Sequence, residues 1–152
     1  MKLDLSTMQS AIVAALPAYV RWTVNGIPLD FDFSYAQRGL RELSGEICER
    51  GDKEWGNLLI FGKYDLSEGG GAAPWLCIRK TDGVVCGLDL ERESAIFFLN
   101  SSLERFIQTF GLLNEYLGVG ALLPLDVEKR VRDIDPDSYP GSDWRLLVDY
   151  LG

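Results

Sequence analysis

The chain has 152 residues and a mass of 17.0 kDa, with 47% hydrophobic and 25% charged residues, which is the composition of one globular domain and not of a disordered chain. Its 15 basic and 23 acidic residues give a formal net charge of −8, a balance that disfavours binding to a nucleic-acid backbone or to an anionic membrane. The absence of histidine removes the commonest general base and the commonest transition-metal ligand, which argues against most hydrolase and metal sites.

Charge distribution and cysteine content narrow the class further. Each third of the chain holds five basic residues, against six acidic residues in 1–50, eight in 51–100 and nine in 101–152, so the acidity increases toward the C-terminus. The three cysteines are an odd number without CxxC spacing, which favours a reducing compartment. The sequence carries no recognisable signal peptide and no run of about 20 apolar residues, so we expect a cytoplasmic protein.

The N-terminal residues predict a helix, a turn and an extended segment. Ser6 and Gln9 have the spacing of a capping box, and an apolar helical face follows until Pro17 ends the pattern. A turn over residues 25–28 leads into residues 29–33, where apolar residues and aspartates alternate. This alternation is typical of a short strand with one buried face.

A second helix is expected around residue 43. Leu40, Leu43 and Ile47 recur at helical spacing, and Gly51 stands where a C-terminal cap belongs. The helix predicted in this way contains Gly39.

The middle of the chain predicts strands. Residues 58–61 form a short apolar run bounded by glycines, which is typical of a strand buried on both faces. Three consecutive glycines follow within residues 67–73. They lack the helix and the Lys-Ser or Lys-Thr pair that a phosphate-binding loop requires, so we interpret the segment as a flexible hairpin connection.

Residues 75–90 predict a β-hairpin around an Asp-Gly turn. A three-residue loop over residues 81–83 keeps the apolar residues of both strands on one face, and it pairs Ile78 with Cys86. In this register Cys86 points into the core and Cys77 points outward, so we expect neither a disulfide between them nor a redox role.

The C-terminal third predicts one strand and three helices. Residues 95–99 form an apolar strand, and a second capping box, Ser101 with Glu104, starts the longest helix directly after it. Apolar residues in that helix repeat at i, i+3, i+4 and i+7 and indicate a face in the core. A short polar helix is expected at residues 126–133, and Ser142 is expected to cap a closing helix.

The sequence assigns no catalytic residue, no cofactor and no metal site. Carboxylate pairs are so frequent that none stands out as a general acid and base. The aspartates near residue 135 lie among prolines and lack the mid-loop glycine and terminal glutamate of a calcium-binding loop. We expect Trp55, Trp75 and Trp144 to fill the core and not to stack on a ligand.

The order of several short motifs resembles the SUKH superfamily. The junction from Asn100 to Phe106, Asn-Ser-Ser-Leu-x-x-Phe, is most similar to the fourth SUKH group, and Asp135-Pro136 before Trp144 is similar to the usual ending of the family. The resemblance covers roughly residues 16–151. It also includes, in chain order, Gly26-Ile27-Pro28, Leu58 to Gly62, Trp75 to Ile78, Thr81 to Val84 and Leu88-Asp89.

The resemblance implies an α+β fold, with a central, largely antiparallel β-sheet flanked by N-terminal and C-terminal helices, in a single SUKH-like domain over residues 1–152. It also implies a bacterial immunity protein, which binds and neutralises a cognate polymorphic toxin, often a nuclease or deaminase domain. The family has no catalytic motif, so no enzymatic activity is expected. Its binding surface varies between members, so no binding role is transferred to the shared motif residues.

The net negative charge of the chain and the resemblance to SUKH immunity proteins point to the same kind of partner. A nuclease is cationic around its substrate groove, and an acidic protein can occupy that groove with electrostatic steering of association. The candidate contact surface is therefore the set of acidic outward residues near the sheet edge: Asp65, Glu68, Asp82, Asp89, Glu91 and Glu93. Each of them can also be a solvated residue that only keeps the protein soluble.

Two other functions remain open at this point. The first is an intracellular scaffold or regulatory adaptor of the same fold with several weak protein partners. The second is a small-molecule binder or an acid-dependent hydrolase, which a deep pocket with convergent carboxylates would favour. The sequence does not define the toxin, the binding face or the oligomeric state.

Overall fold

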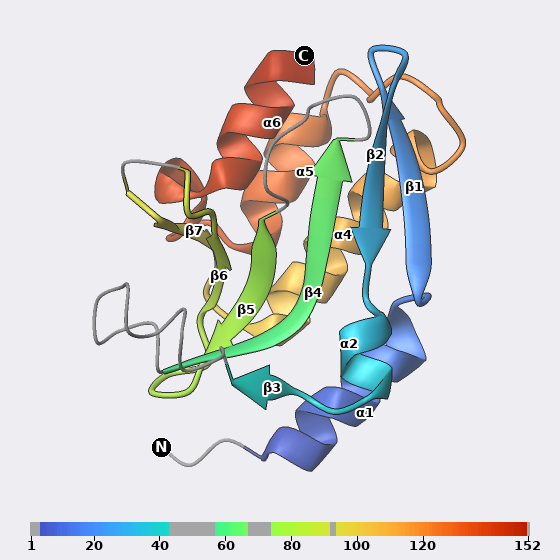
Figure 1. Ribbon diagram of the computed structural model, residues 1–152. Helices are drawn as coiled ribbons and strands as arrows, with labels where there is room; N and C mark the ends of the chain where they lie inside the picture. Colours follow the sequence, from blue (N-terminus) through green and yellow to red (C-terminus); the bar gives the residue numbers. More distant parts are fainter. Residues whose placement is uncertain (1–3, 43–56, 67–73, 92–93, 152) are drawn as a thin grey trace.

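A computed structural model describes residues 4–42, 57–66, 74–91 and 94–151 (Figure 1). Its strands are Tyr19–Val24 (β1), Ile27–Asp32 (β2), Arg41–Glu42 (β3), Leu58–Leu66 (β4), Trp75–Arg79 (β5), Val85–Leu88 (β6) and Ile96–Asn100 (β7). Its helices are Leu5–Ala15 (α1), Ser34–Gln37 (α2), Leu103–Leu117 (α4), Val127–Ile134 (α5) and Asp143–Leu151 (α6), with a 3-10 turn at Tyr139–Gly141.

One sheet forms the centre of the described part of the chain. It has seven strands in the order β1-β2-β4-β5-β6-β7, with β3 pairing beside the first half of β4, and every pair is antiparallel. Helices α4, α5 and α6 lie behind one face of the sheet, here called the core face, and α1 and α2 lie at its lower end (Figure 1). The predicted α+β class, with a central antiparallel sheet and helices from both ends of the chain, is confirmed. None of the helices described is long and apolar enough to span a membrane.

Aromatic side chains fill the space between α4 and the core face. The rings of Trp22 and Phe31 lie 4.8 and 5.0 Å from the ring of Phe110, and Phe61 lies 5.3 Å from Phe106. All five side chains are at most 5% exposed. Offset and edge-to-face ring pairs at these distances add to the free energy of burial. The predicted core face of the longest helix is thus confirmed.

Strand β1 is an element that the sequence analysis does not predict. Its residues alternate between exposed and buried positions up to Val24, and a two-residue turn then returns the chain into β2. The turn residues Asn25 and Gly26 have φ values of 51° and 78°, the left-handed conformation that a two-residue hairpin turn of this kind requires. The predicted turn at 25–28 therefore joins two strands instead of following a helix.

Two helices begin one or two residues away from the predicted caps. The N-cap of α1 is Asp4 and not Ser6, because the Asp4 carboxylate accepts a backbone hydrogen bond from the first turn at 3.1 Å. The N-cap of α4 is Ser102 and not Ser101, since the Ser102 hydroxyl accepts the corresponding bond at 3.2 Å. Both helices otherwise occur where the sequence predicts them.

The second predicted helix is wrong in its described part. Helix α2 ends at Gln37, and the chain continues as β3 after Gly39, which has a φ of 104°. A glycine in this conformation ends a helix and does not continue it. Gly51, Trp55 and the hairpin connection predicted at residues 67–73 lie outside the described residues.

The β5–β6 hairpin is present, but the predicted register is wrong. Cys77 lies opposite Cys86, so the four residues 80–83 form the loop instead of three. The loop is held by the amide of Gly83, which donates a hydrogen bond to the carbonyl of Arg79 at 2.8 Å. Both cysteines therefore face the side of the sheet away from α4, here called the outer face, as free thiols in a small apolar cluster. Alternation fails here because all four residues of β6 are buried.

Buried polar side chains join β7 to the C-terminal helices. Asp135, which is 5% exposed, accepts hydrogen bonds from the amide and the hydroxyl of Ser101, both at 2.8 Å. The indole of Trp144 donates to Asn100 at 2.7 Å, and the hydroxyl of Ser142 accepts a hydrogen bond from the Trp144 amide at the start of α6. The predicted short polar helix, the closing helix and the buried position of Trp144 are confirmed. Trp75 is only half-buried, in the outer-face cluster.

Candidate partner-binding surface

The structure places four of the six acidic candidates, and it separates them. Asp65 lies near the end of β4, and Asp89 and Glu91 follow β6 at the same end of the sheet. Asp82 lies in the β5–β6 loop at the opposite end. The other two candidates, Glu68 and Glu93, lie outside the described residues.

Two of these carboxylates hold turns together. Asp82 accepts hydrogen bonds from the Arg79 guanidinium at 2.9 and 2.5 Å, which lower the pKa of Asp82, and another from the Val84 amide at 3.1 Å. Asp89 accepts a hydrogen bond from the amide of Glu91 at 3.0 Å. Because the charge of Asp82 is balanced by a neighbouring cation, this residue attracts a basic partner weakly.

Asp65 belongs to a row of charged residues on the outer face. The register of β2 and β4 places Asp65 opposite Asp30, and Lys63 opposite Asp32. Asp30 in turn lies opposite Arg21 of β1. These residues line, with their neighbours, a shallow groove of about 480 Å³. We call its three aspartates, Asp30, Asp32 and Asp65, the outer carboxylates.

The outer carboxylates differ in their partners. Arg21 donates two hydrogen bonds to Asp30, at 2.6 and 3.0 Å, and this contact raises the pKa of Arg21. Asp32 accepts hydrogen bonds from the amide and the hydroxyl of Ser34, at 2.9 and 2.5 Å, and so holds the start of α2. Asp65 is exposed, and its carboxylate has no hydrogen bond or ion pair with the described residues. It is therefore the outer carboxylate most available to a partner.

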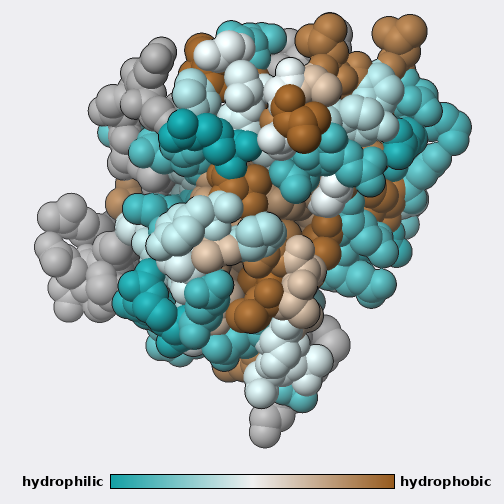
Figure 2. Space-filling model, turned by 90° about the vertical axis from the view of Figure 1, so that its right-hand side faces the viewer, coloured by the Kyte–Doolittle hydropathy of each residue, from teal (hydrophilic) through white to brown (hydrophobic). Residues whose placement is uncertain are grey.

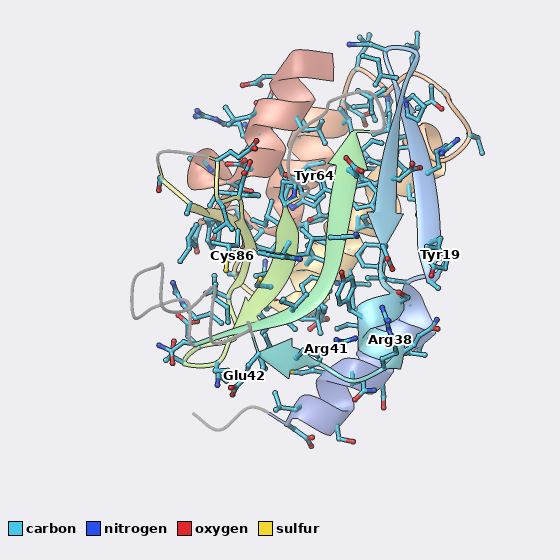
Figure 3. All side chains as sticks on the ribbon, viewed as in Figure 1. Tyr19, Arg38, Arg41, Glu42, Tyr64 and Cys86 are labelled. Carbon is cyan, nitrogen blue, oxygen red and sulfur yellow. The ribbon has the colours of Figure 1, made fainter. Side chains whose placement is uncertain are left out.

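Positive charge gathers at the lower end of the outer face. Figure 3 shows Arg38 and Arg41 there, beside α2 and β3 and below the groove. Their guanidinium carbons lie 5.3 and 5.8 Å from the centre of the Tyr35 ring, within the range of cation–π contact. Glu42 lies beside them and pairs with Lys80 at 2.5 Å, so the lower end carries charges of both signs.

Sequence reasoning missed Asp30 and Asp32 as candidates, although the signal was present. The alternation in residues 29–33 puts both aspartates on the side opposite three buried apolar residues, Leu29, Phe31 and Phe33. The pairing of β2 with β4 brings Asp65 beside them, and no local pattern in the sequence shows that pairing.

An apolar cavity of about 290 Å³ lies between α6 and the core face. Its walls include Leu76, Phe97 and Trp144, and Asp143 is the single carboxylate among the described residues that line it. These lining residues do not include the convergent pair of carboxylates that an acid-dependent hydrolase needs. Among the residues described, no group of three or more cysteines and carboxylates is arranged to hold a metal ion.

The two described cysteines are buried thiols. Burial raises the pKa of both thiols well above the usual range, that of Cys86 to about 11. A thiol with such a pKa is protonated at neutral pH and is a weak nucleophile. Neither cysteine is therefore activated for covalent chemistry.

Comparison of the chain with protein-family models, with curated proteins and with solved structures finds no match.

Proposed function

We propose that the chain is a bacterial immunity protein that acts in the cytoplasm. It binds a cognate polymorphic toxin, a nuclease or deaminase domain, by direct protein contact and neutralises it by covering its substrate groove. Three observations support the proposal: the SUKH resemblance over roughly residues 16–151, the α+β fold that this resemblance implies, and the net charge of −8. The free thiols of Cys77 and Cys86 support a reducing compartment.

Asp65, at its place among the outer carboxylates, is the observation that carries the proposal, because Asp30 is paired with Arg21 and Asp32 holds the start of α2. Asp30, Asp32 and Asp65 project from two paired strands, so their positions are fixed by the backbone before any partner arrives. A partner with a cationic groove gains from such a prearranged surface, because little side-chain or loop entropy remains to be lost on binding. Complementary charge also raises the association rate toward about 10⁸ M⁻¹s⁻¹ at low salt.

Co-expression with the toxin domain encoded beside this gene tests the proposal. We expect this chain to restore growth of cells that produce the toxin domain, and the two purified proteins to form a one-to-one complex. Failure to rescue together with failure to co-purify contradicts the immunity function. Several weak partners without rescue from a toxin indicate the adaptor function instead.

A charge reversal tests the role of the outer carboxylates. We expect Asp65→Lys to lower the association rate about tenfold at low salt and to reduce its salt dependence. Asp149→Lys is the matched control, because Asp149 is an exposed residue of α6, on the other side of the sheet, and its reversal changes the net charge equally. Equal rates for the two variants contradict a contact through the outer carboxylates.

A further inference from the structure

The loop between α4 and α5 exposes three large apolar side chains. Val119, Leu122 and Leu125 are 79%, 90% and 106% exposed, more than any other large apolar residue in the described part of the chain. Figure 2 shows hydrophobic side chains projecting at the upper end of the molecule, around this loop and the β1–β2 hairpin. We call these three residues the apolar loop. A cluster of this kind marks an interaction site more often than a single exposed leucine does.

The backbone of this loop is held in place. The amide of Ala121 donates to the carbonyl of Tyr116 at 2.8 Å, and the amide of Val127 donates to the carbonyl of Pro124 at 3.1 Å. Leu123, between the exposed residues, packs against the main core. These hydrogen bonds hold the backbone of the loop at both ends, while Val119, Leu122 and Leu125 stay outside the core.

Carboxylates flank the apolar loop on both sides. Glu115 precedes it on α4, and Asp126 and Glu128 follow it at the start of α5, all three exposed. Arg130 donates a hydrogen bond to the hydroxyl of Tyr116 at 2.9 Å, lies over its ring and interacts with the charges of Asp126 and Glu115. Lys129, the other cation beside the loop, is paired with Asp133 at 2.7 Å. The border of the apolar loop therefore keeps a net negative charge, with three carboxylates against Arg130.

The apolar loop lies beside the upper end of strand β1. Gly120 of the loop approaches Thr23 of β1, at the upper end of the β1–β2 hairpin. Thr23 lies two residues beyond Arg21 on the same face of that strand, and Arg21 is bound to Asp30. The apolar loop thus lies next to β1, the strand whose Arg21 lines the groove of the outer face.

We propose that the apolar loop is the docking site for a protein partner whose own surface has an apolar pocket bordered by lysines or arginines. The inference rests on the proposed function, because the partner it names is the toxin domain. Charge selects this occupant: a second copy of the chain would bring two acidic borders together, and an anionic membrane would repel them. The leucines supply affinity, and the carboxylates supply orientation and association rate.

The experiment measures binding of the toxin domain encoded beside this gene to the full chain and to two double variants. We expect Leu122→Asp with Leu125→Asp to raise the Kd at least about a hundredfold, as loss of two apolar anchors does. Leu5→Asp with Val13→Asp is the matched control, because both residues are exposed apolar residues on α1, and we expect its Kd to change less than about threefold. All four positions are exposed, so thermal unfolding of both variants is expected to match the wild type.

A charge variant tests the border separately. Glu115→Lys with Asp126→Lys and Glu128→Lys is expected to lower the association rate at least about tenfold at low salt, and the difference is expected to shrink as salt is added. Unchanged rates at low salt overturn the partner chemistry proposed here.

The remaining outcomes separate this inference from the proposed function. Wild-type binding that the leucine variant retains overturns the docking site and leaves the immunity function standing. Absence of wild-type binding contradicts the immunity function and with it the partner named here. Two other occupants are tested directly. The proposal is overturned if the wild type self-associates in sedimentation velocity and the leucine variant does not. It is also overturned if the wild type co-sediments with vesicles of phosphatidylcholine and phosphatidylserine and the leucine variant does not.

Discussion

The indole nitrogen of Trp144 donates a hydrogen bond to the side-chain oxygen of Asn100 at 2.7 Å, between residues that are 6% and 2% exposed. The amide nitrogen of Asn100 in turn lies 3.3 Å from Thr109 of α4 and 3.3 Å from Asp135. One side chain thus connects β7, α4 and the segment that leads into α6. In a buried network each group that loses its partner keeps the full cost of its desolvation.

We expect Asn100→Ala to lower the free energy of unfolding by about 2–4 kcal/mol, because the indole N–H and the Asp135 carboxylate each lose a partner. Urea unfolding followed by tryptophan fluorescence measures the change. Gln108→Ala, at an exposed position of α4, is the control and is expected to stay within about 0.5 kcal/mol of the wild type. A loss below about 1 kcal/mol for Asn100→Ala contradicts the importance of the network.

Phe97 occupies the space that a side chain at position 87 would need. A Cβ atom on Gly87 would lie 2.0 Å from the Phe97 ring, so we expect Gly87→Ala to destabilise the protein by about 1–3 kcal/mol. Adding Phe97→Leu is expected to restore part of the loss. Gly111→Ala is the matched control, because that helical position has open space and alanine there is expected to stabilise by about 0.5–1 kcal/mol. Equal effects at the two glycines would argue against the contact.

Asp82 makes a pH-dependent contribution to stability. Its ion pair with Arg79 lowers the carboxyl pKa below 3.8, so the contribution is present above the unfolded-state pKa and is lost as the pH falls through the folded-state pKa. We expect Asp82→Asn to lower the free energy of unfolding at pH 7 by about 0.2–1 kcal/mol. The difference from the wild type is expected to shrink as the pH is lowered below 3.8. Urea unfolding at several pH values measures this difference in the free energy of unfolding. If the difference does not change with pH, the effect comes from uncharged contacts and not from the ion pair.

The buried thiols predict slow labelling of the native protein. With its pKa raised to about 11, Cys86 is a thiolate in only about one molecule in a thousand at pH 8, against roughly a quarter in the unfolded chain. In a Cys48→Ser background, labelling of Cys77 and Cys86 by a thiol reagent at pH 8 is therefore expected to follow unfolding. Rapid labelling in native buffer, with an unchanged unfolding curve, would contradict this burial.

The hydroxyl of Tyr139 is buried and has no hydrogen-bond partner among the described residues. Since removal of an unsatisfied hydroxyl costs nothing, Tyr139→Phe is expected to leave stability unchanged or to raise it by up to about 1 kcal/mol. Ser142→Ala is the contrasting variant, because the Ser142 hydroxyl donates to the carbonyl of Leu99 at 2.6 Å and caps α6. That variant is expected to lose about 1–2 kcal/mol. Calorimetry of both variants measures the two changes in stability, which are expected to be opposite in sign.

The fold was predictable where one face of an element is buried and the other is exposed to solvent. The stripe of α4 and the alternation of 29–33 each distinguish a buried side from an exposed one, and both predictions are confirmed. The register of β5 and β6 was not predictable, because residues on both faces of β6 are buried and alternation then carries no information. The prediction of a helix through Gly39 is wrong. The positive φ of Gly39, and not the spacing of the leucines, decides where α2 ends.

The candidate surface was predictable only in part. The net charge of −8 follows from composition alone, but the grouping of Asp30 with Asp65 depends on a strand pairing between distant segments. The apolar loop gave no sequence signal at all, because leucines at 122 and 125 are the residues expected in a core. Local sequence does not distinguish a leucine that packs inward from one that is held outside by its backbone.

The α4–α5 loop is held by main-chain hydrogen bonds and not by its exposed side chains, and this has an evolutionary consequence. The main-chain hydrogen bonds of Ala121 and Val127 form whatever side chains stand at positions 119, 122 and 125, since none of these three reaches the core. Substitutions there are therefore expected to leave folding unchanged. If this loop is the docking site proposed above, selection acts on these three positions through the partner alone, and the partner can change while the rest of the molecule stays constant.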